Sequence, residues 1–209
     1  MLLAIVGGFL DAYTYIGRGG VFCNAQTGNI VLLCVAGARG KWFEALTYFP
    51  PILAFVCGVF AAEAIKHNSS KFIKADWAYV VIAFEIVVLV AIGFIPGNKA
   101  NVLVTIVASF AASLQVSSFS RLVDSSYATT MSTGNLRSAS QNTYLAITKK
   151  DRQAKLRAIR YYLVILAFMA GALIGSVITL YLGIHGIWGA AFILACACGL
   201  LVYSGWRQS

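Results

Sequence analysis

Hydrophobic positions gather in six long runs, and polar residues separate one run from the next. The runs cover residues 2–17, 43–65, 77–95, 102–119, 161–182 and 187–203. A helix needs about 20 apolar residues to cross the hydrocarbon core of a bilayer, and the six runs reach or approach that length. The pattern therefore predicts six transmembrane helices joined by short connections, within a single membrane domain.

The connections and the small residues indicate how these helices pack. Pro96-Gly97-Asn98 and residues 183–186 are turn signals, which predict tight hairpins between the third and fourth and between the fifth and sixth helices. Gly171, Gly175 and Gly58 lie within apolar runs, where small residues let helices approach closely. We expect these glycines to mark helix contacts within the chain.

Two further segments have helical character but do not fit as spans. Residues 24–38 are too few, and residues 131–147 are too polar. Each carries the same tripeptide near its start, Thr27-Gly28-Asn29 (the first motif) and Thr133-Gly134-Asn135 (the second motif), half a chain length apart. The context matches as well, with Phe9-Leu10-Asp11-Ala12 before the first motif and Ser113-Leu114-Gln115-Val116 before the second. This is the pattern of an internal duplication.

Each half would then hold one span, an irregular polar stretch, a short re-entrant or broken helix, and two more spans. Because three spans per half is an odd number, the halves, residues 1–97 and 98–209, would be inverted repeats, as in many transporters. The basic residues at 149–160 and at 66–74 fall on one side only if the short helices do not cross. We expect that side, with both termini, to be cytoplasmic, in the inner membrane of a bacterial cell.

The composition determines how the net charge of the chain is interpreted. Of 209 residues, 60% are hydrophobic and 11% are charged, and the mean hydropathy is +0.81, which excludes an ordinary soluble fold. In such a chain the net charge of +9 indicates cations retained on the cytoplasmic side rather than nucleic-acid binding. The five cysteines and two histidines show no metal-ligand spacing, so we expect neither a metal nor another cofactor.

The two motifs suggest a central site. We expect the chain to enter the membrane, turn at the first motif with Thr27 as helix cap, and leave as a short helix over residues 30–38. Two such helices entering from opposite faces would point their positive ends at one midplane site, which favours a polar or anionic solute. The alternative is that the motifs are ordinary helix starts that brace the breaks. The residues expected at the site are Asn24, Gln26, Thr27, Gly28 and Asn29 from the first half and Thr130, Ser132, Thr133, Gly134 and Asn135 from the second.

Polar residues inside spans complete the candidate site, because ionisable groups in a membrane are costly and usually functional. Glu85 lies near the middle of an apolar run without a cation within a helical turn. It is either a protonatable coupling residue or a neutral interhelical contact. Asp11 and its counterpart Gln115 either form an asymmetric pair at the site or bond the backbone freed at the helix breaks.

These residues resemble the YoaK family of bacterial membrane proteins of unknown function. The resemblance rests on Gly8-Phe9-Leu10-Asp11-Ala12 and on residues 20–29 in the first half, and on Ser113-Leu114-Gln115 and residues 129–134 in the second. It covers essentially the whole chain, although Val116 and Ser117 stand where the family often has Asn-Ala. The resemblance implies a six-helix inner-membrane protein and brings no substrate or mechanism.

The leading functional hypothesis is a small-solute transporter or channel with its site between the two motifs. The competing hypothesis is a non-transporting membrane assembly or accessory protein, and a membrane-embedded enzyme comes third. The sequence offers no catalytic constellation, since its histidines lie in loops and its serines lack a paired base, so we predict no enzyme. The expected partners are the lipid bilayer and a small polar or anionic solute, and self-association into a homo-oligomer is left open.

Overall fold

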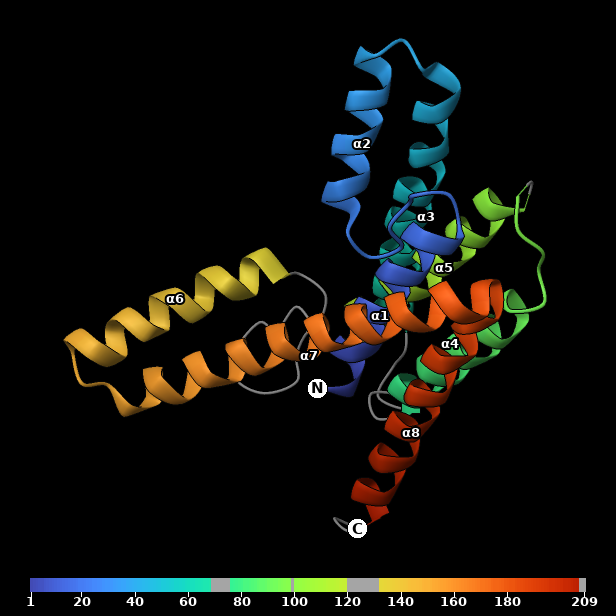
Figure 1. The fold of residues 1–209 in the computed structure, drawn as a ribbon. Coiled ribbons are helices and arrows are strands. Elements are labelled where there is room, and N and C mark those ends of the chain that lie inside the picture. Colours follow the sequence, from blue (N-terminus) through green and yellow to red (C-terminus); the bar gives the residue numbers. More distant parts are fainter. Residues whose placement is uncertain (69–75, 99, 120–131, 207–209) are drawn as a thin grey trace.

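The computed structural model describes residues 1–68, 76–98, 100–119 and 132–206, and these ranges are helical without any strand (Figure 1). The helices are α1 (Leu2–Gly17), α2 (Gln26–Ala38), α3 (Trp42–Asn68), α4 (Asp76–Ile92), α5 (Asn101–Phe119), α6 (Ser132–Thr148), α7 (Arg152–Leu182), the 3-10 helix η1 (Gly183–Gly186) and α8 (Ile187–Trp206). The predicted all-α class is confirmed. Each of the six apolar runs is helical over most or all of its length.

Length and hydropathy mark part of this set as membrane-crossing. Three helical stretches are long and apolar enough to cross a bilayer: Trp42–His67, Asn101–Phe119 and Arg152–Tyr203, the last of which holds α7, η1 and α8. Three shorter helical stretches are also apolar: Leu2–Gly17, Gln26–Ala38 and Tyr79–Ile92. The described ranges are therefore all-helical, and three of their helical stretches have the length and hydropathy of membrane spans.

The start of α2 corrects one prediction. The helix begins at Gln26 with Ala25 as its cap residue, and no side chain caps it. Thr27 lies in the first turn and is exposed, so the expectation that Thr27 caps a helix starting after Asn29 is wrong. The physical reason is that the chain turns earlier, where the Asp11 carboxylate accepts hydrogen bonds from the backbone N–H groups of Asn24 and Ala25. In the second motif, Thr133 likewise lies within the first turn of α6 and is exposed.

A buried core surrounds α1, which packs against α7 and α8, while α4 packs against α5 and α8. Phe9, Tyr13, Ile82, Leu89 and Leu194 are fully buried members of this core, and they come from α1, α4 and α8. Burying apolar side chains in this way is not itself a driving force in lipid, so close packing must hold the helices together. The core therefore depends on how closely the helix backbones approach.

Glycines provide that approach at two crossings. A methyl group added at Gly171 would overlap the carbonyl oxygen of Ile5 in α1, and one at Gly175 would lie 2.7 Å from Phe9 Cα. On the other side of the molecule, a methyl group at Gly58 in α3 would overlap the Ser113 hydroxyl of α5. The predicted close packing at these glycines is confirmed, and it lies within the chain.

The helix contacts also repeat between the two halves of the chain. Helix α1 packs on α7 as α5 packs on α3, α2 packs on α3 as α6 packs on α7, and α4 packs on α5 as α8 packs on α1. The contact between α4 and α8 joins equivalent helices. Exchanging the first four α-helices with the last four thus interchanges these pairs and leaves the α4–α8 pair unchanged, whereas the smaller contact between α7 and α8 has no equally extensive counterpart between α3 and α4 in the described part of the chain.

Two pairs of helices project from the centre as separate arms (Figure 1). Helix α2 lies along the first part of α3, and α6 lies along the first part of α7. The arms differ in chemistry, since α2 exposes Ile30, Val31 and Val35. The second arm exposes the predicted basic cluster: Lys149, Lys150, Arg152, Lys155, Arg157 and Arg160.

Candidate functional site

Asp11 holds the polar stretch that follows α1. Its side chain is only 5% exposed, and its Oδ1 accepts hydrogen bonds from the backbone N–H of Asn24 at 2.7 Å and of Ala25 at 3.4 Å. The Cys23 thiol donates to the same oxygen at 3.6 Å. A carboxylate at this position also meets the positive end of α2. The second oxygen, Oδ2, is buried without a hydrogen-bond partner in the described part of the chain.

Asn24 continues this cluster. Its amide nitrogen donates to the carbonyl oxygen of Gly7 and to Cys23 Sγ, both at 3.3 Å, while its Oδ1 is buried without a partner among the described residues. Cys23 is fully buried and not in a disulfide, as expected for a thiol that acts as a small apolar group. Asp11 and Asn24 thus each present one unpaired acceptor oxygen inside the protein.

Asn29 of the first motif braces the same stretch from α2. It is fully buried, and its Oδ1 accepts from the Phe22 backbone N–H at 2.9 Å. Its Nδ2 donates to the Phe22 carbonyl at 2.6 Å and to Gln26 Oε1 at 2.9 Å. Gln26 in turn donates to the Cys23 carbonyl at 2.7 Å. The first motif therefore ties the chain before α2 to the first turn of that helix.

Gly28 has a packing role in this brace. A methyl group at Gly28 would lie 2.9 Å from the ring of Phe22, which stacks on Tyr15 with ring centroids 4.8 Å apart. Close approach of the Phe22 ring thus requires glycine at this position. Among the three residues of the first motif, Asn29 and Gly28 contact the preceding stretch, whereas Thr27 is exposed.

The second motif is less enclosed. Asn135 is only 3% exposed, while Thr133 and Gly134 are exposed and Ser132 is half-buried. Thr130 lies outside the described residues. No atom of the described residues lies within 4 Å of a methyl group added at Gly134, in contrast to Gly28. The two motifs are alike in their buried asparagine and unlike in their surroundings.

Glu85 and Gln115 form a second polar contact, between α4 and α5. Glu85 is 1% exposed, and its Oε2 accepts from Gln115 Nε2 at 2.7 Å. Its Oε1 is buried without a partner in the described ranges, and no described lysine or arginine lies within ion-pair distance of it. The interhelical contact predicted for Glu85 is present. A role in proton coupling stays a prediction.

These two polar clusters share one interior. Cys23 lies in the apolar core with Ile82 and Leu89 of α4, and its thiol donates to Asp11 Oδ1. Within the described part of the chain, Asp11 Oδ2, Asn24 Oδ1 and Glu85 Oε1 are buried acceptor oxygens without a partner, and the hydroxyls of Ser109 and Thr179 are also unpaired. Buried polar atoms without partners are costly and call for an explanation. Such oxygens can accept hydrogen bonds from a proton-bearing group, from an ammonium or from the hydroxyls of a polar solute.

Arg18 is a structural residue that the sequence pattern missed. It is 1% exposed and forms no ion pair with any described carboxylate. Its guanidinium donates to the carbonyl oxygens of Ile92 at 3.1 Å and Ile95 at 3.0 Å, and to the Tyr13 hydroxyl at 2.8 Å. It therefore closes the end of α4, where unpaired carbonyls and the negative helix end favour a cation. In the sequence it looks like an ordinary loop cation.

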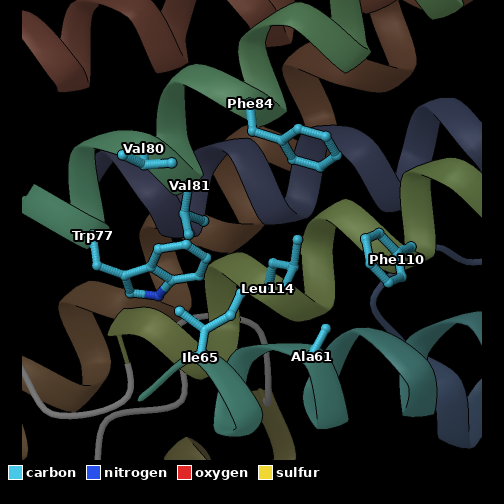
Figure 2. A pocket seen from close by; sticks show the side chains of 8 residues that line it. All are labelled: Ala61, Ile65, Trp77, Val80, Val81, Phe84, Phe110 and Leu114. Atoms are coloured by element: carbon cyan, nitrogen blue, oxygen red, sulfur yellow. The ribbon is translucent and has the colours of Figure 1, made fainter. Parts of the chain in front are cut away.

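One pocket of the described structure is apolar, and its lining residues Phe84 and Leu114 are chain neighbours of Glu85 and Gln115. It has a volume of about 260 Å³ and is bordered by α3, α4 and α5 (Figure 2). None of the predicted site residues lines it. In the described ranges no three His, Cys, Asp or Glu side chains group in a way that could hold a metal ion.

Comparison with known proteins places the chain among uncharacterised membrane proteins. The family described as a protein of unknown function, DUF1275, matches residues 1–200. The chain is 25% identical over 178 residues to the UPF0700 transmembrane protein YoaK of Bacillus subtilis (strain 168), a match that covers 83% of this chain and 79% of that protein. No solved structure matches the chain.

Proposed function

The chain belongs to the DUF1275 family, whose description names no activity, and from its own geometry we propose that it is a small-solute transporter or channel rather than an enzyme. One observation carries this proposal. Two buried carboxyl groups and one amide oxygen, from Asp11, Glu85 and Asn24, each hold an acceptor that is unpaired among the described residues, and no described lysine or arginine forms an ion pair with either carboxyl group. A protein that only needed to pack would gain by pairing or replacing these groups.

The proposed architecture is six membrane spans arranged as inverted repeats, residues 1–97 and 98–209, in the bacterial inner membrane with cytoplasmic termini. The correspondence of helix contacts between the two halves supports this architecture. The site would then lie where α4 and α5, which belong to different halves, meet beside α1. In many transporters the substrate site also lies at the interface of the repeats.

The chemistry of the site favours a solute that donates hydrogen bonds. The positive end of α2 would attract an anion, but Asp11 already occupies that position with its own carboxylate. Among the described residues, the unpaired atoms of Asp11, Asn24 and Glu85 are all acceptor oxygens. A small primary ammonium or a polyhydroxyl compound could satisfy them, and Glu85 would couple transport to a proton. The residues proposed to bind the solute are Asp11, Asn24 and Glu85, positioned by Gln115 and by the brace at Asn29.

Uptake into proteoliposomes tests this proposal, with methylammonium as the ammonium probe and glycerol as the hydroxyl probe. We expect saturable uptake of at least one probe by the natural protein, and loss of that uptake in the Asp11→Asn, Glu85→Gln double variant. Glu44→Gln is the matched control, since Glu44 is exposed and forms an ion pair with Lys41 at 3.2 Å on the surface. Uptake by the double variant equal to that of the control would contradict the proposal.

The second candidate is a non-transporting membrane assembly or accessory protein. The observation that favours it is the first motif itself, in which Asn29 and Gln26 bond within the chain as a structural brace does. The two candidates differ in what a solute does to the purified protein. A rise in the unfolding temperature with either probe, absent from the double variant, would support transport, and no change with both probes would support the accessory role.

A further inference from the structure

The apolar pocket differs in chemistry from the polar interior around Asp11 and Glu85. Its lining is formed by eight apolar or aromatic residues from three helices: Ala61, Ile65, Trp77, Val80, Val81, Phe84, Phe110 and Leu114. Figure 2 shows these side chains facing a common space between α3, α4 and α5. At about 260 Å³, it is larger than the apolar cavity of about 150 Å³ that can hold benzene. Such a lining can select a ligand by shape and apolarity only.

The pocket opens on the surface that would face lipid. Val80 is 53% exposed and Phe84 is 42% exposed, and both lie on α4 at its rim. Ile65, on α3, is 36% exposed. Because α3 and α5 are among the stretches able to cross a bilayer, this rim would lie against hydrocarbon chains. The ligand available there is a lipid.

The two ends of the pocket differ in polarity. Trp77 and Ile65 lie toward one end, and Phe110 and Phe84 toward the other (Figure 2). At the first end the Trp77 indole N–H donates to the Ser118 hydroxyl at 3.0 Å. Tryptophan with an anchored N–H is typical of the interface between membrane and water. The Trp77 end would thus lie at the level of lipid headgroups, and the Phe110 end would lie deeper.

A lysine completes the headgroup end. Lys66 follows Ile65 on α3, and its Nζ donates to the Ser117 carbonyl and to Glu63 Oε1, both at 2.7 Å. Ser117 precedes Ser118, the partner of Trp77, so the lysine and the indole are anchored at the same place on α5. An ammonium group has three N–H donors, and these two bonds leave one for a phosphate oxygen.

We propose that this pocket binds one acyl chain of a bilayer phospholipid, with the phosphate of that lipid at Lys66. The apolar lining takes the chain, and the anchored cation and indole fix the headgroup at the opposite end from Phe110. The site is separate from Asp11 and Glu85, and the proposal holds whether or not the protein transports a solute. The phospholipid would be retained as a bound molecule rather than exchange freely with the surrounding lipid.

Lipid retention tests this assignment. The protein is reconstituted with phosphatidylglycerol, extracted into detergent, and examined by native mass spectrometry for bound lipid. We expect one lipid on the natural protein and at least about tenfold less on Ala61→Phe, since a ring at position 61 would occupy the space of the chain. Ala64→Phe is the matched control, because Ala64 is exposed on the same helix and does not line the pocket. Equal retention by the two variants would overturn the proposal.

A second measurement keeps the test independent of how Ala61→Phe folds. Phospholipid brominated on its acyl chains should quench the fluorescence of Trp77, taken as the difference between the natural protein and Trp77→Phe. Adding Val80→Phe at the rim should reduce this quenching, whereas Val87→Phe, at an exposed position of the same helix outside the pocket, should not. Quenching of Trp77 that is equally strong in the Val80→Phe and Val87→Phe variants would contradict binding in the pocket. Lys66→Gln should weaken retention by about fivefold if the phosphate lies at Lys66, since losing a charge-assisted hydrogen bond costs about 1 kcal/mol or more.

Discussion

Helices α1 and α5 begin the two halves of the chain, and each carries one buried polar residue at the corresponding place. In α1 this residue is Asp11, which binds the backbone of the stretch leading into α2. In α5 it is Gln115, which donates to Glu85 on α4, a helix of the other half. Asp11 thus stabilises the fold of its own half, whereas Gln115 connects the two halves. The contacts between helices thus correspond in the two proposed halves, whereas their buried polar contacts differ.

The largest expected effect comes from Arg18, which like Asp11 is a buried charged residue that hydrogen-bonds to backbone groups. Arg18→Leu would remove the guanidinium donor from the carbonyl oxygens of Ile92 and Ile95 and from the Tyr13 hydroxyl. Because hydrogen bonds to charged groups contribute about 1.5 to 3 kcal/mol each, we expect a loss of at least about 4 kcal/mol of stability. The measurement is the midpoint of unfolding in detergent. Arg39→Leu, at an exposed site at the end of α2, serves as the control.

An Arg18→Leu protein as stable as Arg39→Leu would show that the stretch after α1 does not hold α4 in place. Of the two buried charged residues Asp11 and Arg18, only Asp11 would then have a structural role in the first half of the chain.

The glycines test whether the contacts between helices correspond in the two halves. Gly171→Ala would force α7 away from α1, and Gly58→Ala would force α3 away from α5, because each added methyl group meets an atom of the facing helix. Overpacking of this kind costs about 1 to 3 kcal/mol, and we expect similar losses at both positions. Gly199→Ala is the control, since nothing lies within 4 Å of the added group in α8. A large loss at Gly171 with none at Gly58 would break the correspondence.

The sequence predicted the helices better than their relation to one another. Apolar runs of near-membrane length identified the helical segments, because hydropathy and helix length are properties of local sequence. The start of α2 was misplaced because its turn is fixed by Asp11, 13 positions before Asn24 and on another helix. Residue preferences at Thr27 carry no information about that contact.

The candidate site likewise contains some residues that the sequence identified and others that it did not. Glu85, Asp11 and Gln115 stand out in the sequence because polar residues in apolar runs are rare. Arg18 does not stand out, since it follows the first run and resembles any loop cation. Its burial depends on where the end of α4 lies, which only the packed structure fixes. The apolar pocket has no sequence signal either, because its lining residues are common in every membrane helix.

The two asparagines provide a smaller test of the motifs. Asn29→Ala would remove three hydrogen bonds and leave the backbone groups of Phe22 unpaired, so we expect a loss of about 2 kcal/mol. Asn29→Asp should recover part of this, because its carboxylate can still accept from the Phe22 N–H. Unfolding midpoints of Asn29→Ala and Asn135→Ala, compared side by side, show whether the second motif is an equivalent brace. No loss at Asn29 would contradict the bracing role.

Glu85→Gln should change stability by less than about 1 kcal/mol, because an amide oxygen can still accept from Gln115 and burying a neutral group is less costly. Under the transport proposal the same change should abolish uptake of the probe solute. A variant that keeps its unfolding midpoint and loses uptake assigns Glu85 to function. One that loses both in parallel assigns it to the contact between the halves.

The smallest effect is expected at the exposed threonines. Neither Thr27 nor Thr133 caps its helix or lies in the core, so Thr27→Ala and Thr133→Ala should each shift stability by less than about 0.5 kcal/mol. The two threonine variants nevertheless distinguish between two positions for the solute site. If uptake depends on Asp11 and Glu85, both threonine variants should transport at the natural rate. Loss of uptake with an unchanged unfolding midpoint would instead put the solute at the tips of α2 and α6, where the motifs would act as a pair despite their different surroundings.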